Sequence, residues 1–170
     1  MADVATYESL ATYNGTGSST QITFSSIDQT YTDLVLVVSN IDIQIDNMGL
    51  RFNSDSGTNY SRTRMIGDGT SFPPPTARNT NQSYLYFGYK DDAVSTKPVN
   101  HVLQIQNYSN SNKYKTCLNR YTTVSGGNYN VMYEVAMWRS TSAINQIDIF
   151  SGNANFSTNC MFTLYGIKAN

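Results

Sequence analysis

The sequence predicts an all-β protein, folded as an antiparallel, jelly-roll-like β-sandwich of about eight or nine strands. Three observations support this prediction. Apolar residues recur at every second position in short runs, and helical spacing does not recur. Turn-forming stretches rich in Gly, Asn and Ser separate these runs. Asn, Ser and Thr occur 19 times each among 170 residues, beside 13 Tyr and 11 Gly, a composition typical of β-rich, loop-rich proteins.

The first three predicted strands lie in the N-terminal third of the chain. Thr20–Ser26 alternates Ile22 and Phe24 with polar residues, which favours a strand with one buried face. Asp33–Ser39 is apolar on both faces, as expected of a strand in the middle of a sheet. Met48–Phe52 follows as a short third strand.

Three further strands are predicted in the middle of the chain. Ser83–Tyr89 is rich in aromatic residues, which favour strands. His101–Tyr108 places Leu103 and Ile105 on one face, and Lys113–Val124 is a long, half-polar strand. The short polar stretches Ser109–Asn112 and Ser125–Asn128 suit hairpin turns.

The segment Asn130–Trp138 shows the clearest alternation in the sequence. Its apolar residues alternate with Glu134. We therefore expect Glu134 to lie on the other face and to point out of the strand. The apolar set comprises Val131, Tyr133, Val135 and Met137.

The last two predicted strands are Ala143–Phe150 and Met161–Ile167. The final strand places Phe162 and Leu164 on one face, with Met161, Thr163 and Tyr165 on the other. We expect it to lie inside a sheet. Two sheets that bury each other's apolar faces account for this number of short strands better than one open sheet.

The predicted domain organisation is simple. Residues 1–19 form an N-terminal arm or a first edge strand, and residues 20–170 form the β-sandwich domain. Asn53–Gln82 has little apolar periodicity and contains three consecutive prolines, Pro73–Pro75, so we predict a long loop there. Lys90–Asn100 is predicted as a second polar loop. These two loops are the candidate contact surface.

Composition excludes several classes of partner. Charged residues make up 14% of the chain and the net charge is −1, without a Lys/Arg cluster that could bind phosphates, so nucleic acid is not an expected partner. No apolar run is long enough to span a membrane. The N-terminus lacks a secretory signal, so we expect cytoplasmic synthesis. Cys117 and Cys160 are expected to be reduced, buried thiols rather than a disulfide.

The sequence offers no catalytic, cofactor or metal site. His101, at the start of a strand, is expected to be structural, because no activated nucleophile motif accompanies it. Nothing in the spacing of the carboxylates selects an acid–base pair, Glu8 and Glu134 included. Asn53–Gly57 resembles half of a calcium loop, but Arg64 stands where the closing Glu should be. We therefore predict a turn there and a protein that is not an enzyme.

Aromatic residues leave one binding activity open. Four of them could stack on carbohydrate, but aromatics at alternate strand positions more often belong to a core or a subunit interface, and we prefer that interpretation. The four are Tyr84, Tyr86, Tyr89 and Trp138.

Four stretches taken together resemble a family of tailed-bacteriophage virion structural proteins. "QTYTDL" and "FTLYGI" are the more specific pair among them. Asp28, where the family often has Pro, and Asn159–Cys160, where it often has Gly-Ser, are departures that leave the fold intact. The four stretches are Ile22–Ser39, Leu50–Ser61, Ile105–Thr116 and Phe162–Lys168.

The resemblance implies a location in the virion but does not specify a role there. The preferred hypothesis is a capsid decoration (cement) protein that binds the major capsid protein as a homo-oligomer, a trimer or dimer, and stabilises the shell. The alternative is the receptor-binding tip of a tail fibre or baseplate, which would bind a cell-surface glycan. A glycan-degrading enzyme is the least favoured. Met1–Ser19 and Asn53–Gln82 are the expected contact elements, and deletion of Met1–Ser19 is expected to leave the sandwich folded.

Overall fold

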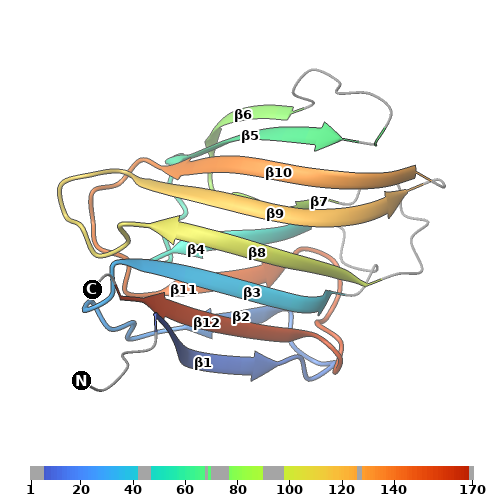
Figure 1. Ribbon diagram of the computed structural model, residues 1–170, viewed down its shortest axis with the longest axis horizontal. Coiled ribbons are helices and arrows are strands. Elements are labelled where there is room, and N and C mark those ends of the chain that lie inside the picture. Colours follow the sequence, from blue (N-terminus) through green and yellow to red (C-terminus); the bar gives the residue numbers. More distant parts are fainter. Residues whose placement is uncertain are drawn as a thin grey trace.

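The protein is a two-layered antiparallel β-sandwich, with twelve strands in the residues that the structure describes (Figure 1). The computed structural model describes residues 6–41, 47–67, 69, 77–89, 98–125 and 128–168. No helix occurs in these residues, so the predicted all-β class is confirmed. The strands are β1 (Tyr7–Asn14), β2 (Gln21–Phe24), β3 (Asp33–Ile41), β4 (Asn47–Phe52), β5 (Tyr60–Gly67), β6 (Ala77–Gln82), β7 (Leu85–Tyr89), β8 (Val99–Gln106), β9 (Lys115–Ser125), β10 (Asn128–Trp138), β11 (Ile147–Ser151) and β12 (Met161–Ile167).

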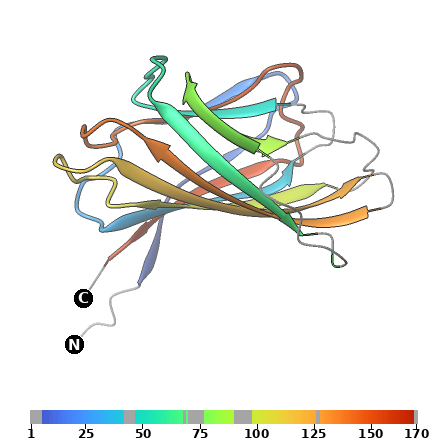
Figure 2. The same cartoon turned by 90° about the horizontal axis from the view of Figure 1, so that it is seen from above.

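The two layers differ in size. The larger sheet has eight strands in the order β1-β12-β3-β8-β9-β10-β5-β6, and the smaller has four in the order β2-β11-β4-β7. Figure 2 shows them as two layers, with the β5–β6 end of the larger sheet turned toward the smaller one. Every strand pair in both sheets is antiparallel.

The connectivity bears on the jelly-roll part of the prediction. Successive strands from β1 to β4 alternate between the two sheets, and so do β7 with β8 and β11 with β12. Such alternation between two facing sheets is what a jelly roll requires. The pairs β5–β6 and β9–β10 extend the larger sheet beyond that pattern. We describe the fold as an antiparallel sandwich and keep the jelly-roll connectivity as an interpretation.

The strand count exceeds the predicted eight or nine because three strands lack a clear signal in the sequence. β1 lies in residues 1–19 and forms one edge of the larger sheet. β5 and β6 lie inside Asn53–Gln82, so the prediction of one long loop there is wrong. The buried positions of β5 include arginines, which hide its period-two pattern, and β6 is a polar edge strand. Pro73–Pro75 and residues 90–97 lie outside the described residues.

The core fills the space between the sheets. β3 contributes Leu34, Leu36 and Val38, all fully buried, from the middle of the larger sheet. Ile147 and Ile149 of β11 face them from the smaller sheet and are equally buried. Burying each such aliphatic side chain stabilises the fold by about 1.5–3 kcal/mol. The two sheets therefore depend on each other for their stability.

The C-terminal strand lies inside the larger sheet, as predicted. β12 pairs with β3 on one side and with β1 on the other, from Tyr7 opposite Ile167 to Asn14 opposite Met161. Phe162 and Leu164 point into the core and are buried. β12 thus joins the N-terminal strand to the rest of the sheet.

Both cysteines are free and buried, as expected. Burial raises the pKa of the Cys117 thiol to about 12, so this thiol is protonated and unreactive at neutral pH. No helix in the described part of the chain is long and apolar enough to cross a membrane.

Candidate functional site

Trp138 lies in the core rather than on a glycan-binding surface. Its ring packs against those of Phe52 and Tyr60, with centroid distances of 5.4 and 6.3 Å. Its indole Nε1 donates a 2.7 Å hydrogen bond to Oδ2 of Asp55. The preferred interpretation of this residue, as a core aromatic, is confirmed.

Tyr84 and Tyr86 are half-buried and engage other side chains. The Tyr84 ring lies 4.8 Å from that of Tyr86 and 5.3 Å from that of Phe150. The guanidinium carbon of Arg51 lies 4.7 Å from the Phe150 ring centroid. Burial is the main cause that raises the pKa of Tyr84 to about 12. These contacts leave the two rings poorly available for stacking on a sugar. The side chain of Tyr89 lies outside the described residues.

The segment Asn53–Gly57 is a turn held by its own aspartate. The carboxylate of Asp55 accepts hydrogen bonds from the backbone nitrogen of Gly57 at 2.8 Å and from Nδ2 of Asn59 at 2.9 Å. Burial raises the pKa of Asp55, but these bonds and the one from Trp138 outweigh burial and lower it. No group of three or more His, Cys, Asp or Glu suited to a metal ion occurs among the described residues.

The orientation predicted for β10 is wrong. Glu134 points into the sandwich and is buried, whereas the alternate apolar residues face solvent. The carboxylate of Glu134 accepts a 2.6 Å charged hydrogen bond from Arg62 of β5 and a 3.1 Å bond from Nδ2 of Asn119 of β9. Arg62 lies on the neighbouring strand, and its side chain also points inward. The Arg62 guanidinium therefore takes the place of water as the partner of the Glu134 carboxylate.

Glu134 belongs to a polar cluster that we define as Arg62, Arg64, His101, Asn119, Tyr121 and Glu134. The His101 ring lies 4.5 Å from the Tyr121 ring, and burial lowers the pKa of His101 to about 3, so its imidazole is neutral. Burial raises the pKa of Glu134, and the charge of Arg62 opposes that shift. Each member is at most 6% exposed, so a substrate in solution cannot reach it. The cluster is a polar part of the interior, as expected for His101.

The outward face of β10 is the most conspicuous apolar surface in the described residues. We define the β9–β10 patch as Leu118, Val131, Tyr133 and Val135, whose side chains are 40 to 45% exposed. Leu118 of β9 stands directly opposite Val135 in the register of the two strands. Contiguous exposed apolar residues rimmed by polar ones mark protein contact sites in soluble proteins.

The patch continues into a wide face with little charge. Of the outward side chains described on β12, β3, β8, β9, β10 and β5, two are charged: Arg120 and, at the end of β3, Asp33. Six strands spaced about 4.8 Å apart make the face roughly 29 Å wide, and about eight residues of strand make it roughly 27 Å long. The resulting area of roughly 780 Å² is close to the ~800 Å² that each partner buries in a standard interface. We call this surface the outer face.

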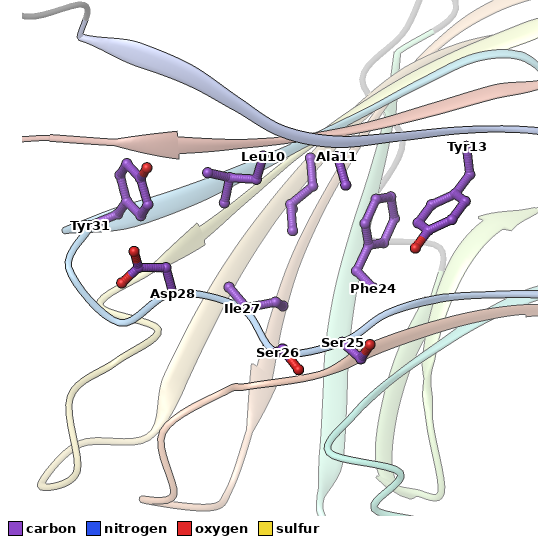
Figure 3. Close-up of a pocket in the computed structure, with 10 residues that line it drawn as sticks. Leu10, Ala11, Tyr13, Phe24, Ser25, Ser26, Ile27, Asp28 and Tyr31 are labelled. Carbon is purple, nitrogen blue, oxygen red and sulfur yellow. The ribbon is translucent and has the colours of Figure 1, made fainter.

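A second surface feature lies where the edge strands of the two sheets face each other. β1 ends one sheet and β2 ends the other, and two hollows of about 210 and 230 Å³ lie between them. Tyr13 lines both hollows. Figure 3 shows the larger sheet's edge strand above the first hollow, with Tyr13 beside Phe24 at one end and Leu10 toward Tyr31 at the other. We call the two hollows the edge groove.

Sequence reasoning misses both surfaces for identifiable reasons. It turns Val131, Tyr133 and Val135 of the β9–β10 patch inward, because it places Glu134 on the outward side of the strand. The edge groove depends on the contact between Tyr13 and Phe24, whose ring centroids are 5.0 Å apart, and the spacing of residues gives no signal for it. Comparison of the chain with family models, curated proteins and solved structures found no significant match.

Proposed function

We propose that this protein is a structural, non-enzymatic component of a tailed-phage virion, and that it decorates the capsid by binding the major capsid protein through its outer face. The observation that supports this role is the β9–β10 patch, with side chains 40 to 45% exposed on a sheet face of low charge. Such a face loses little by desolvation when another protein covers it, because few charged groups must be stripped of water.

The proposal moves the contact surface from the predicted loops to the outer face. Asn53–Gln82 contains two strands of the larger sheet, and Tyr7–Asn14 is an edge strand paired along its length with β12. The strands β1, β5 and β6 in these segments are parts of the larger sheet. The resemblance to virion structural proteins supports a location on the phage particle. Binding an assembled shell better than its separate subunits would stabilise the shell, and a closed trimer or dimer would multiply the contacts.

The first test is to locate the protein on virions with gold-labelled antibody in electron microscopy. Labels over the head are expected. The second test measures co-sedimentation of the purified protein with capsids that lack it. Tyr133→Lys should reduce binding at least about tenfold, because it buries a charge in the contact. Ser142→Lys adds the same charge at an exposed position of the loop between β10 and β11 and should bind like the wild type. Equal binding by both variants would exclude the outer face.

The receptor-binding tip is the second candidate, and the edge groove favours it. A solvent-open groove lined by a tyrosine and by hydroxyl groups suits a glycan better than a flat protein surface. Labels confined to the tail would support this candidate over capsid decoration.

A further inference from the structure

The edge groove combines an aromatic ring with an apolar floor. Tyr13 is 43% exposed, and its ring meets that of Phe24 at 68°, an edge-to-face contact that holds it in place. Leu10, Ala11 and Leu164 line the first hollow beside it. One face of a pyranose ring is formed by C–H groups, and such a face packs well against an aromatic ring and aliphatic side chains.

Polar groups of the groove are available for a ligand. Ser25 and Ser26 line the first hollow, and within the described residues their hydroxyls and that of Tyr13 make no hydrogen bond. The carboxylate of Asp28 lines the same hollow and accepts one bond, from the backbone nitrogen of Thr30 at 3.0 Å. A carboxylate has about four acceptor positions, so it can also accept bonds from neighbouring hydroxyls of one ligand.

The backbone of the groove is strained where these groups lie. Ser26 has a φ of 54°, in the left-handed region that residues other than Gly, Asn and Asp rarely occupy. Ser26 directly follows Ser25, so the strained turn sets the direction of two hydroxyl-bearing residues. Strain of this kind, at about 1–3 kcal/mol per residue, is concentrated at ligand sites.

The second hollow continues the same chemistry. It is lined by neutral polar residues together with Ile22 and Phe156, and Tyr13 separates it from the first hollow. The polar residues are Asn14, Thr16, Ser19, Gln21 and Thr23. Within the described residues, neither hollow is lined by Lys or Arg, and Asp28 is the one carboxylate among the two linings. An anionic ligand would therefore meet one repulsive group and no cation in the linings, and Lys168, 5.1 Å from the Tyr31 ring, is already paired with Glu8.

From this arrangement we propose that the edge groove binds a neutral saccharide, with one sugar ring on each side of Tyr13. The apolar floor and the tyrosine contact the C–H faces of the sugar, and the carboxylate of Asp28 binds its hydroxyl groups. Together the two hollows reach the lower end of the ~300–1,000 Å³ range of ligand clefts. The inference goes beyond capsid decoration and does not depend on where in the virion the protein sits.

The experiment uses the intact chain and defined sugars as probes. Saturation-transfer NMR and titration calorimetry would measure binding of glucose, galactose, N-acetylglucosamine, lactose and maltose, beside glucuronic and sialic acids. Binding of at least one neutral sugar is expected by about 10 mM, where a millimolar affinity would be close to saturation. Tyr13→Ala should weaken it about tenfold through loss of stacking. Asp28→Asn should also weaken it.

The matched control is Tyr114→Ala, which removes a tyrosine that is 55% exposed and lines neither hollow. It should change the affinity for the sugar by less than about twofold. Asp28→Asn keeps the shape of an exposed side chain, so it tests the groove even if Tyr13→Ala disturbs the fold. Three results would overturn the proposal. The folded protein could show no saturation transfer to any neutral sugar, or it could prefer the acidic sugars. The groove variants could also change self-association and leave sugar binding unchanged. Sugar binding by a head-located protein would confirm the site and leave capsid decoration intact.

Discussion

The ring of Tyr31 lies directly on the backbone of Gly166. A Cβ atom added to Gly166 would come within 2.4 Å of Cδ1 of Tyr31, far inside van der Waals contact. Tyr31 precedes β3 and is buried, and Gly166 lies in β12. The two residues belong to the "QTYTDL" and "FTLYGI" segments, which are distant in sequence. This contact links the two segments physically, because the ring of Tyr31 fits against β12 only where the residue has no side chain.

Replacing Gly166 should therefore destabilise the fold. We expect Gly166→Ala to lower the free energy of unfolding by about 2 kcal/mol, the usual effect of overpacking a filled site. Urea unfolding followed by fluorescence would measure it. Gly67→Ala is the matched control, because Gly67 also lies in a strand and no atom lies within 4 Å of its added Cβ. Equal destabilisation by both substitutions would contradict the steric explanation, and Tyr31→Ala should reduce the penalty of Gly166→Ala.

The buried pair of Arg62 and Glu134 should show a different pattern. Glu134→Leu leaves the buried Arg62 charge without its carboxylate, and we expect a loss of about 3–5 kcal/mol. The double variant Arg62→Met, Glu134→Leu should recover much of that loss, because no isolated charge remains. The comparison pair is Glu8 with Lys168, 3.4 Å apart and exposed, where Glu8→Gln should change stability by less than about 1 kcal/mol. Denaturant titration of the wild type and these three variants would decide. A double variant no more stable than Glu134→Leu alone would argue against a coupled pair.

The stability of the protein should fall in mild acid because of His101. The pKa of this histidine is lowered by burial to about 3 in the folded state, against 6.5 when unfolded. The unfolded chain therefore binds the proton first, so stability is complete above pH 6.5 and is lost between pH 6.5 and 3. At about pH 4 this group should cost up to about 3 kcal/mol, at about 1.36 kcal/mol per pKa unit. Glu134 acts in the opposite direction, since its pKa is raised.

A comparison of two pH profiles isolates the histidine. His101→Phe keeps a ring beside Tyr121 but cannot titrate, so its stability should fall less steeply than that of the wild type from pH 6.5 to about pH 4. The free energy of unfolding would be measured at several pH values for each protein. Parallel profiles would show that His101 does not titrate on unfolding.

The two thiols should be protected while the protein is folded. Cys117 and Cys160 are fully buried, and the raised pKa of Cys117 disfavours the reactive thiolate. We expect iodoacetamide to modify neither residue in native buffer and both in concentrated guanidinium, as counted by mass spectrometry. Modification of Cys117 at the rate of a free thiol would show that the sheet opens locally.

The sandwich is predictable from the sequence because apolar and polar residues alternate in most strands, as burial of one face of a strand requires. β3 and β12 are recognised by apolar faces that are in fact buried, and β9 pairs with β8 and with β10 as the predicted hairpins require. β5 cannot be recognised in this way. Its inward positions hold Arg62 and Arg64, whose burial depends on partners in β9 and β10 that are far away in the sequence. Periodicity detects burial of apolar side chains and cannot detect burial of a paired charge.

The same limit reverses the predicted orientation of β10. Apolar residues usually face a core, which assigns Tyr133 and Val135 to the interior and Glu134 to solvent. β10 shows the opposite pattern: Glu134 is hydrogen-bonded in the interior, and Tyr133 and Val135 are exposed. That exposed side carries the proposed contact surface, so the error coincides with the candidate functional site. The edge groove is not predictable, since β1 and β2 meet there only through the packing of two sheets.

The position of β12 has a consequence for how the protein is made. Among the described strands β1 leaves the ribosome first, yet its ladder partners lie in β12, which leaves last. The larger sheet therefore cannot close until residues 161–167 are present, and contacts of such long sequence separation form slowly. A chain that stopped before β12 would expose the unpaired edges of both β1 and β3, which aggregate readily. The larger sheet can therefore be completed only after Ile167 has been synthesised, because β12 is the strand that joins β1 to β3.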